Sequence, residues 1–231
     1  MYFSPFYFDP TYLIVLPALI FAMWAQQRVT ATFRRYLKEY SAVGKTGAQV
    51  AREILDANGL TDVRVELTGG NLTDHYDPRE RVLRLSRPVY QSTSVAAIGV
   101  AAHEAGHAIQ HAKNYIPLGI RNNLFPIASF GSQMAIPLFF IGLIFAADSL
   151  MLIGIWFFIA ALAFQIVTLP VEFNASSRAL ALLSNGGYIT QSELPKTKEV
   201  LKAAALTYVG AVAVSATQLI RLLVLRNSRR D

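Results

Sequence analysis

The chain has 231 residues, of which 53% are apolar and 16% are charged, whereas an average soluble domain carries about 25% charged residues. The deficit is concentrated in residues 122–177, which contain no Lys or Arg and only two acids, Asp148 and Glu172. This distribution excludes an ordinary soluble globular protein. The net charge of +6 does not indicate a nucleic-acid binder, because the basic residues flank apolar runs. The absence of cysteine excludes disulfides, cysteine-ligated metals and thiol catalysis.

Four apolar stretches approach the roughly 20 residues that a helix needs to cross a bilayer. The first, residues 12–25, is expected to be a retained anchor, because it has no basic leader and no cleavage signal. Residues 125–147 and 150–171 are separated by a short predicted turn, Asp148–Ser149, and should form a hairpin across the membrane. The fourth stretch, residues 203–225, is less apolar and is either a span or a buried helix. We therefore expect a mainly α membrane protein with three to four transmembrane helices.

The distribution of Lys and Arg predicts the orientation of these helices. No basic residue precedes the first stretch, whereas residues 28–121 contain 13, residues 178–202 contain four and the tail 221–231 contains four. With four spans and the N-terminus outside, 17 basic residues face the cytoplasm and four face outward. The polar part of the chain is therefore expected in the cytoplasm. The tail arginines are the weak point, since they lie outside only if the fourth helix spans.

The polar region reads as a small α+β unit between membrane helices. Its expected elements are a continuation of the first helix over 28–40, a helix over 47–58 capped by Thr46, a strand over 63–67, a hairpin of 72–76 with 82–85, and a long helix over 95–113 capped by Ser94. We expect five parts along the chain. They are an N-terminal transmembrane anchor (1–27), a cytoplasmic α+β part (28–121), a transmembrane hairpin (122–171), a segment and loop that contains Glu172 (172–202), and a C-terminal apolar helix with a basic tail (203–231).

The strongest chemical signal is an H-E-x-x-H sequence, His103-Glu104-Ala105-Gly106-His107, inside the predicted long helix. Residues four apart lie on one face of a helix, so both imidazoles can bind one zinc ion while Glu104 acts as a general base on a water at the metal. A chance occurrence in this composition has a probability of roughly 0.002, which favours a metal site. Gly106 either permits the close approach of another backbone or is an incidental small residue.

Catalytic zinc usually takes three protein ligands and leaves one position for water. Gln110 and Lys113 occupy the positions where a metzincin has Gly and His, so that class is excluded. His111 would lie about 12 Å along the helix axis from His103, which is too far to share the ion. Glu172 remains, because an acid at the end of an uncharged span indicates function, and the third span would emerge on the same side as the two histidines. The alternative is a solvated Glu at the lipid headgroups.

Four segments of the chain resemble the YugP family of membrane-bound zinc metallopeptidases. They are Asp74–Pro78, Ala101–Gln110, Pro170–Ser176 and Ala203–Tyr208. The resemblance covers nearly the whole chain and implies a bacterial inner-membrane metallopeptidase of gluzincin type with a zincin-like domain. It implies that His103, His107 and Glu172 are the zinc ligands and that Glu104 is the catalytic base.

More distantly, the layout is similar to that of the HtpX and CAAX prenyl protease group. In that group the late Glu is followed three residues on by Ala and then by Asp. Here Ala175 matches, but Ser176 replaces the Asp, so the carboxylate that usually orients a zinc-bound His is missing. Asn174 or another residue is expected to take this role.

Three further residues have two interpretations each. His75 and Tyr76 either donate hydrogen bonds to the oxyanion of the reaction or belong to a turn built by Asp74, Asp77 and Pro78. The strand that carries them could also hold an extended substrate. Arg178 either pairs with Glu172 or a substrate carboxylate, or anchors a lipid phosphate.

These observations predict a membrane-anchored zinc endopeptidase with one Zn²⁺ per chain. It would hydrolyse membrane or unfolded proteins at the cytoplasmic membrane face, with protein or peptide substrates and the lipid bilayer as partners and no nucleic acid. Intramembrane cleavage is a weaker alternative, because the motif helix, bounded by Arg and Lys, is too short to span. A non-catalytic zinc-binding scaffold is the other alternative, although a structural site usually has four ligands and no use for Glu104.

Overall fold

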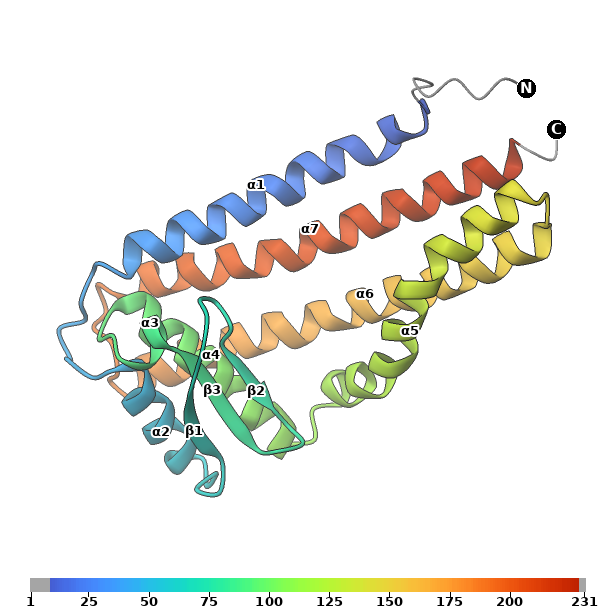
Figure 1. Cartoon of the computed structure of the whole chain (residues 1–231). Helices are drawn as coiled ribbons and strands as arrows, with labels where there is room; N and C mark the ends of the chain where they lie inside the picture. The colour runs from blue at the N-terminus through green and yellow to red at the C-terminus, as the bar shows by residue number, and fades with distance from the viewer. Residues whose placement is uncertain (1–8, 229–231) are drawn as a thin grey trace. The chain divides into compact units, whose positions relative to one another are not determined.

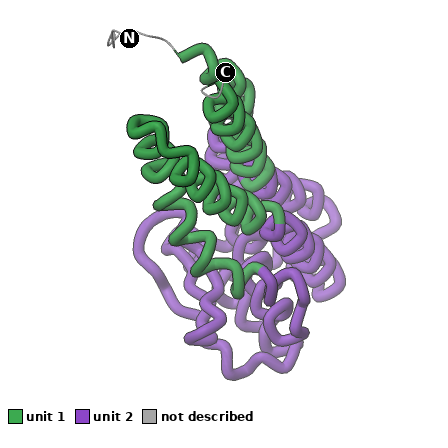
Figure 2. Tube along the Cα trace, turned by 90° about the vertical axis from the view of Figure 1, so that its right-hand side faces the viewer, with its two compact units in different colours: residues 1–24, 121–166, 208–231 green, residues 25–120, 167–207 purple. Residues whose placement is uncertain are grey.

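The computed structural model describes residues 9–228 (Figure 1), so parts of the expected anchor (1–8) and of the basic tail (229–231) lie outside the described residues. The chain divides into two compact units, each assembled from separate stretches of sequence (Figure 2). Unit 1 consists of residues 1–24, 121–166 and 208–231, and unit 2 of residues 25–120 and 167–207.

Most of the chain is helical, and four described helices are long and apolar enough to cross a membrane. They are α1 (Tyr12–Tyr36), α5 (Ile116–Ile144), α6 (Asp148–Asn185) and α7 (Leu194–Asn227). The fourth apolar stretch therefore belongs to a helix that meets the length and composition requirements of a span. Helix α6 continues well past the expected end of its span, through Glu172 to Asn185.

Unit 1 contains the apolar stretches of these helices, and ion pairs join some of its described helix ends. Its buried cluster contains Phe139, Met151, Ile155 and Leu222. Arg221 on α7 donates hydrogen bonds to Asp9 Oδ2 (2.7 Å) and Thr11 Oγ1 (3.0 Å), and its guanidinium lies 3.7 Å from the centre of the Tyr12 ring. Arg226 forms a bidentate pair with Asp148. These contacts hold the start of α1 and the start of α6 beside the last turns of α7.

The turn between α5 and α6 lies earlier than predicted. Residues 145–147 connect the two helices, and Asp148 begins α6 instead of lying in the turn. A carboxylate in the first turn of a helix is stabilised by the positive end of the helix dipole, and this one is also paired with Arg226. Both effects favour starting the helix at this residue.

Unit 2 contains the polar α+β region. Its elements are α2 (Gly47–Ala57), β1 (Arg64–Thr68), β2 (His75–Asp77), β3 (Val82–Ser86), α3 (Arg87–Tyr90) and α4 (Val95–Ala112). The sheet has the order β1-β3-β2, with β1 parallel and β2 antiparallel to β3. Both predicted caps are confirmed: the hydroxyl of Thr46 accepts from the Gln49 backbone N–H, and that of Ser94 accepts from the Ala97 N–H.

Two predicted elements of this unit are too long. The first helix ends at Tyr36, not at Tyr40, because the following residues pair with the segment before α4, where Ser41 N–H donates to the Thr93 carbonyl. The strand predicted over 72–76 is reduced to β2, because Leu72 has a positive φ of 57° and the Thr73 hydroxyl donates to the Gly69 carbonyl. Both positions form turns in place of regular structure.

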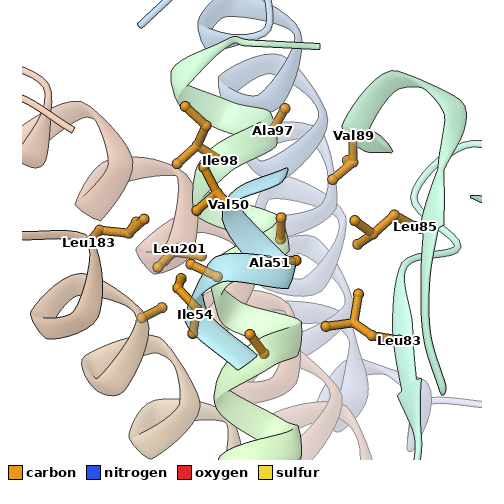
Figure 3. Packing of buried hydrophobic residues seen from close by; sticks show 14 of the residues in the cluster. Val50, Ala51, Ile54, Leu83, Leu85, Val89, Ala97, Ile98, Leu183 and Leu201 are labelled. Carbon is orange, nitrogen blue, oxygen red and sulfur yellow. The ribbon is translucent and has the colours of Figure 1, made fainter. Parts of the chain in front are cut away.

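The hydrophobic core of unit 2 lies around α2, as Figure 3 shows. Val50, Ala51 and Ile54 of α2 are fully buried, with α4 on one side and Leu83 and Leu85 of β3 on the other. Leu183 from α6 and Leu201 from α7 belong to the same cluster. This core contains apolar residues of α4, whereas His103, His107 and Gln110 of the same helix contact α6.

Candidate metal centre

The H-E-x-x-H sequence lies in the middle of α4, in the helical context that the motif requires. Its two histidines stand one turn apart, with ring centroids 4.7 Å apart and ring planes at 85°. His107 is buried and His103 is slightly more accessible. The apolar residues that surround the motif in the sequence place both imidazoles at the edge of the core.

Glu172 of α6 lies against both histidines. Its Oε2 atom is 3.2 Å from His103 Nε2 and 3.5 Å from His107 Nε2, and only 4% of the residue is exposed. One donor atom from each of the three residues lies within 4.8 Å of the other two. The structure thus brings together the three residues that the sequence and the family resemblance select as ligands, although Glu172 follows His107 by 65 positions in the sequence.

The other ring nitrogen of each histidine faces a hydrogen-bonding partner. His107 Nδ1 lies 2.9 Å from Gln110 Oε1, and His103 Nδ1 lies 3.2 Å from Ser176 Oγ. Metal-binding histidines almost always donate this second N–H to an oxygen, which fixes the ring orientation and leaves the opposite nitrogen free for the metal. Ser176, which stands where the distantly similar group has Asp, contacts His103 directly.

Glu104 lies on the same helix and is 8% exposed. Burial raises the pKa of its carboxyl above the ordinary value, although the nearby His103 and His107 oppose the effect. No side chain among the described residues forms a hydrogen bond with this carboxylate. It is therefore a buried acid close to the cluster of donors.

Close packing of α4 against α6 sets the spacing of the donors. A Cβ atom at Gly106 would lie 2.9 Å from the carbonyl oxygen of Ala175 and 3.4 Å from its Cα. Real Cβ atoms do not approach a backbone atom so closely, so any side chain here would push the helices apart. The close backbone approach expected at Gly106 is present, and it occurs one turn from Glu172.

His75 and Tyr76 lie on β2, an edge strand of the sheet. His75 is exposed, and its Nδ1 lies 2.7 Å from the Thr73 carbonyl oxygen, outside the three-residue cluster. The Tyr76 hydroxyl lies 2.9 Å from His111 Nδ1, which couples β2 to the last turns of α4. His111 is therefore a partner of Tyr76, and the structure places it outside the cluster of donors.

The neighbouring aspartates have structural partners. Asp77 Oδ1 accepts from the backbone N–H groups of Arg79 and Glu80, which closes the turn before β3. Asp74 accepts from the backbone and hydroxyl of Ser86, and burial raises the pKa of its carboxyl. These contacts support the turn interpretation for the two acids.

Asn174 and Arg178 lie one turn apart on α6. Arg178 Nε donates to Asn174 Oδ1 at 2.7 Å, and the same oxygen accepts from Gln110 Nε2 at 3.0 Å. Asn174 thus reaches the histidines through Gln110. This role of Gln110 was not predicted from the sequence, where the residue served only to exclude a metzincin. The sequence does contain a signal for this role, because Gln110 is a polar residue three positions after His107 in a mainly apolar helix.

The donor set fits zinc. Two imidazole nitrogens and one carboxylate oxygen converge, the outer nitrogens are hydrogen-bonded, and a free buried acid lies beside them. In the part of the chain that the structure describes, the cluster holds three protein donors. Three donors with a remaining open position are typical of catalytic zinc, whereas structural zinc usually has four.

Comparison with known proteins agrees with this site. The sequence model of the family described as "Putative neutral zinc metallopeptidase" matches residues 11–227. The chain is 47% identical over 218 residues to a Bacillus subtilis (strain 168) protein named "Putative membrane protease YugP", which covers 94% of this chain and 97% of that protein. No solved structure matches the chain significantly. The chain therefore belongs to the family of neutral zinc metallopeptidases that residues 11–227 match, with helices of membrane-spanning length and a His-His-Glu cluster.

Proposed function

We propose that this protein is a zinc-dependent endopeptidase of gluzincin type that cleaves membrane or unfolded proteins at the cytoplasmic face of the bacterial inner membrane. The observation that carries the proposal is the convergence of His103, His107 and Glu172 beside the free carboxylate of Glu104. His103 and His107 would hold the ion through Nε2 and Glu172 through Oε2, with one Zn²⁺ per chain.

When bound, zinc would polarise the scissile carbonyl and lower the pKa of water toward about 7. Glu104 takes the proton from the attacking water, holds it on its carboxylate and transfers it to the leaving amine nitrogen. Burial of Glu104 favours the protonated form that this transfer requires. Gln110 and Ser176 hold the two imidazoles in place through Nδ1.

The donor for the developing oxyanion is expected on β2. Tyr76 is better placed than His75, because its half-buried hydroxyl is oriented by His111 of α4, whereas His75 is exposed and bonded to Thr73. The free backbone edge of β2 is suited to binding an extended peptide by strand pairing.

The proposed orientation rests on the positive-inside rule and on the ion pairs of unit 1. Arg221 and Arg226 account for two of the four tail arginines, and each is neutralised by an aspartate. The contacts also join the beginnings of α1 and α6 to the last turns of α7, as expected if these ends lie on the same outer side. Ser192, between α6 and α7, would then face the cytoplasm.

Two alternative activities are less well supported. Cleavage inside the bilayer would place the motif in a spanning helix, yet α4 is not among the four described helices with the properties of a span. A non-catalytic scaffold would not need Glu104, and a structural site usually has four ligands.

The test combines metal analysis with proteolysis of the full chain in detergent, beside Glu104→Gln. We expect stoichiometric zinc in both proteins and cleavage of casein or a model membrane protein by the wild type alone. A Glu104→Gln variant that cleaves at the wild-type rate would refute the role of Glu104. A folded wild type without zinc would refute the metal assignment, and zinc binding without cleavage of either substrate would favour the scaffold.

Orientation is tested separately, because the chain contains no cysteine. Single substitutions Phe145→Cys and Ser192→Cys place one thiol in each exposed connection. A membrane-impermeant maleimide should label the first, but not the second, in cells with a permeable outer layer. The opposite pattern would reverse the proposed topology.

A further inference from the structure

We propose that Gln110 is a positioning residue that fixes both the tautomer of His107 and the place of Glu172. This inference rests on the proposed zinc peptidase function and extends it to a residue that contacts neither metal nor substrate. The side chain of Gln110 is fully buried, and among the described residues it is the one polar member of the twelve largest side chains with less than 2% exposure. Its position on α4 places it between the two helices that supply the donors.

The amide of Gln110 uses both of its ends. Its Oε1 faces His107 Nδ1 at 2.9 Å, and its Nε2 lies 2.8 Å from the Val171 carbonyl oxygen and 3.0 Å from Asn174 Oδ1. Val171 is the residue before Glu172, and Asn174 lies two residues after it. One side chain therefore contacts His107, a proposed metal ligand on α4, and is hydrogen-bonded to α6 on both sides of Glu172, the proposed ligand of that helix.

Two groups whose hydrogen-bonding roles cannot be exchanged set the direction of this network. The carbonyl of Val171 can only accept, so the NH₂ end of Gln110 must face it. Arg178 can only donate, so Asn174 must turn its oxygen toward Arg178, and that same oxygen receives the second N–H of Gln110. The Oε1 of Gln110 is then left for His107.

This direction determines the state of His107. Because Gln110 presents an acceptor, the Nδ1 of a neutral His107 must carry the proton, and its Nε2 presents a lone pair toward Glu172 and the metal position. Arg178 thus acts through Asn174 and Gln110. The corresponding partner of His103 has no such constraint, because the hydroxyl of Ser176 can donate or accept.

The test measures zinc affinity, by competition with a chromophoric chelator, for the full chain in detergent. Gln110→Met keeps the volume and removes every hydrogen bond of the amide, and we expect zinc to bind about 10- to 100-fold more weakly. The absorption spectrum of the Co²⁺-substituted protein should also change, because the donors on α4 and α6 are no longer held in place by the hydrogen bonds of the Gln110 amide. The matched control is Gln133→Met, which replaces an exposed glutamine of α5 and should leave both readouts unchanged.

Arg178→Met serves as a second variant that leaves Gln110 and the ligands intact. It frees Asn174 to rotate its amide, so zinc binding should weaken to a degree between those of the control and Gln110→Met. Ser176→Ala should have a smaller effect than Gln110→Met. Wild-type zinc affinity and an unchanged Co²⁺ spectrum in Gln110→Met would overturn the inference. If Gln110→Met does not fold, wild-type zinc affinity in Arg178→Met would overturn it. Neither result would affect the proposed function, which is overturned by different results: a wild type that binds no zinc, a zinc-loaded wild type that cleaves neither substrate, or a Glu104→Gln variant that still cleaves.

Discussion

The two units bury polar groups in different ways. In unit 1 charged side chains near the helix ends form ion pairs, such as that of the buried Arg221 with the partly exposed Asp9. In unit 2 the contacts near the motif are chains of mostly neutral hydrogen bonds, from Arg178 through Asn174 and Gln110 to His107. An ion pair specifies which helix ends lie together. A directed chain specifies which atom of a side chain faces a site, and chemistry requires that finer specification.

The largest expected effect is the loss of a donor in unit 2. Glu172→Ala should weaken zinc binding by more than about 100-fold, beyond the range for residues that only orient ligands. The zinc-induced rise in the unfolding temperature should disappear with it, because that rise depends on binding to the folded state. Glu39→Ala is the matched control, since Glu39 forms a partly exposed pair with Lys196. If both variants bind zinc as the wild type does, Glu172 is not a ligand.

The next effect breaks the ion pair of unit 1. Arg221→Leu leaves Asp9 with hydrogen bonds from Thr11 but without its ion-pair partner, and should cost about 3 kcal/mol of stability. Thermal unfolding in detergent measures this cost, and the double variant Asp9→Leu/Arg221→Leu should recover most of it. Zinc affinity should remain near the wild-type value in both. If Arg221→Leu weakens zinc binding as well as lowering stability, the proposed contrast between the two units is wrong.

A smaller effect is expected where α4 meets α6. Gly106→Ala introduces a Cβ atom 2.9 Å from the Ala175 carbonyl oxygen and should cost about 1–3 kcal/mol through overpacking. Zinc should also bind more weakly, because the helices must separate beside their donors. Gly119→Ala is the control, as its added Cβ would meet open space. Unchanged zinc affinity and stability in Gly106→Ala would show that the helix spacing tolerates the change.

The smallest effect depends on pH. Glu193 precedes α7 and accepts from the Thr190 and Ala42 N–H groups and from the Ser41 hydroxyl. Burial opposes its ionisation, but these hydrogen bonds outweigh burial and lower its pKa below 4.5. A lowered folded-state pKa stabilises the fold above pH 4.5, and this contribution is lost as the pH falls through the lowered value.

Glu193→Gln should therefore cost about 1–2 kcal/mol at pH 7. The difference from the wild type should shrink as the pH falls below 4.5. Unfolding temperatures of the two proteins at a series of pH values measure it. A difference that stays constant over this range would show that the charge of Glu193 contributes nothing.

Local sequence patterns predicted much of the fold. Thr46 and Ser94 mark helix starts through their own hydrogen bonds, so both caps could be placed from sequence. Apolar run length likewise identified the membrane-length helices. The end of α1 and the extent of β2 could not be predicted, because Ser41 pairs with Thr93, about 50 residues away, and Leu72 adopts a turn conformation that a strand pattern does not reveal.

The candidate site shows the same division. Motif spacing placed His103 and His107 on one helix face, and an isolated acid identified Glu172. The partners of Gln110 could not be predicted, because they depend on the rotation of α6 about its own axis relative to α4. The contact of Ser176 with His103 could not be predicted either. Serine is shorter than the Asp of the related group, and it reaches the imidazole only because α4 and α6 approach closely here.

The length of α6 has a consequence for biosynthesis. His103 and His107 leave the ribosome before α5, whereas Glu172 follows the apolar part of α6. On the proposed assignment, a nascent chain that has not yet inserted this hairpin carries two of its three metal donors and lacks the helix that orients His103. Proteolytic capacity would then appear only after insertion, which would protect the chain and its neighbours during synthesis.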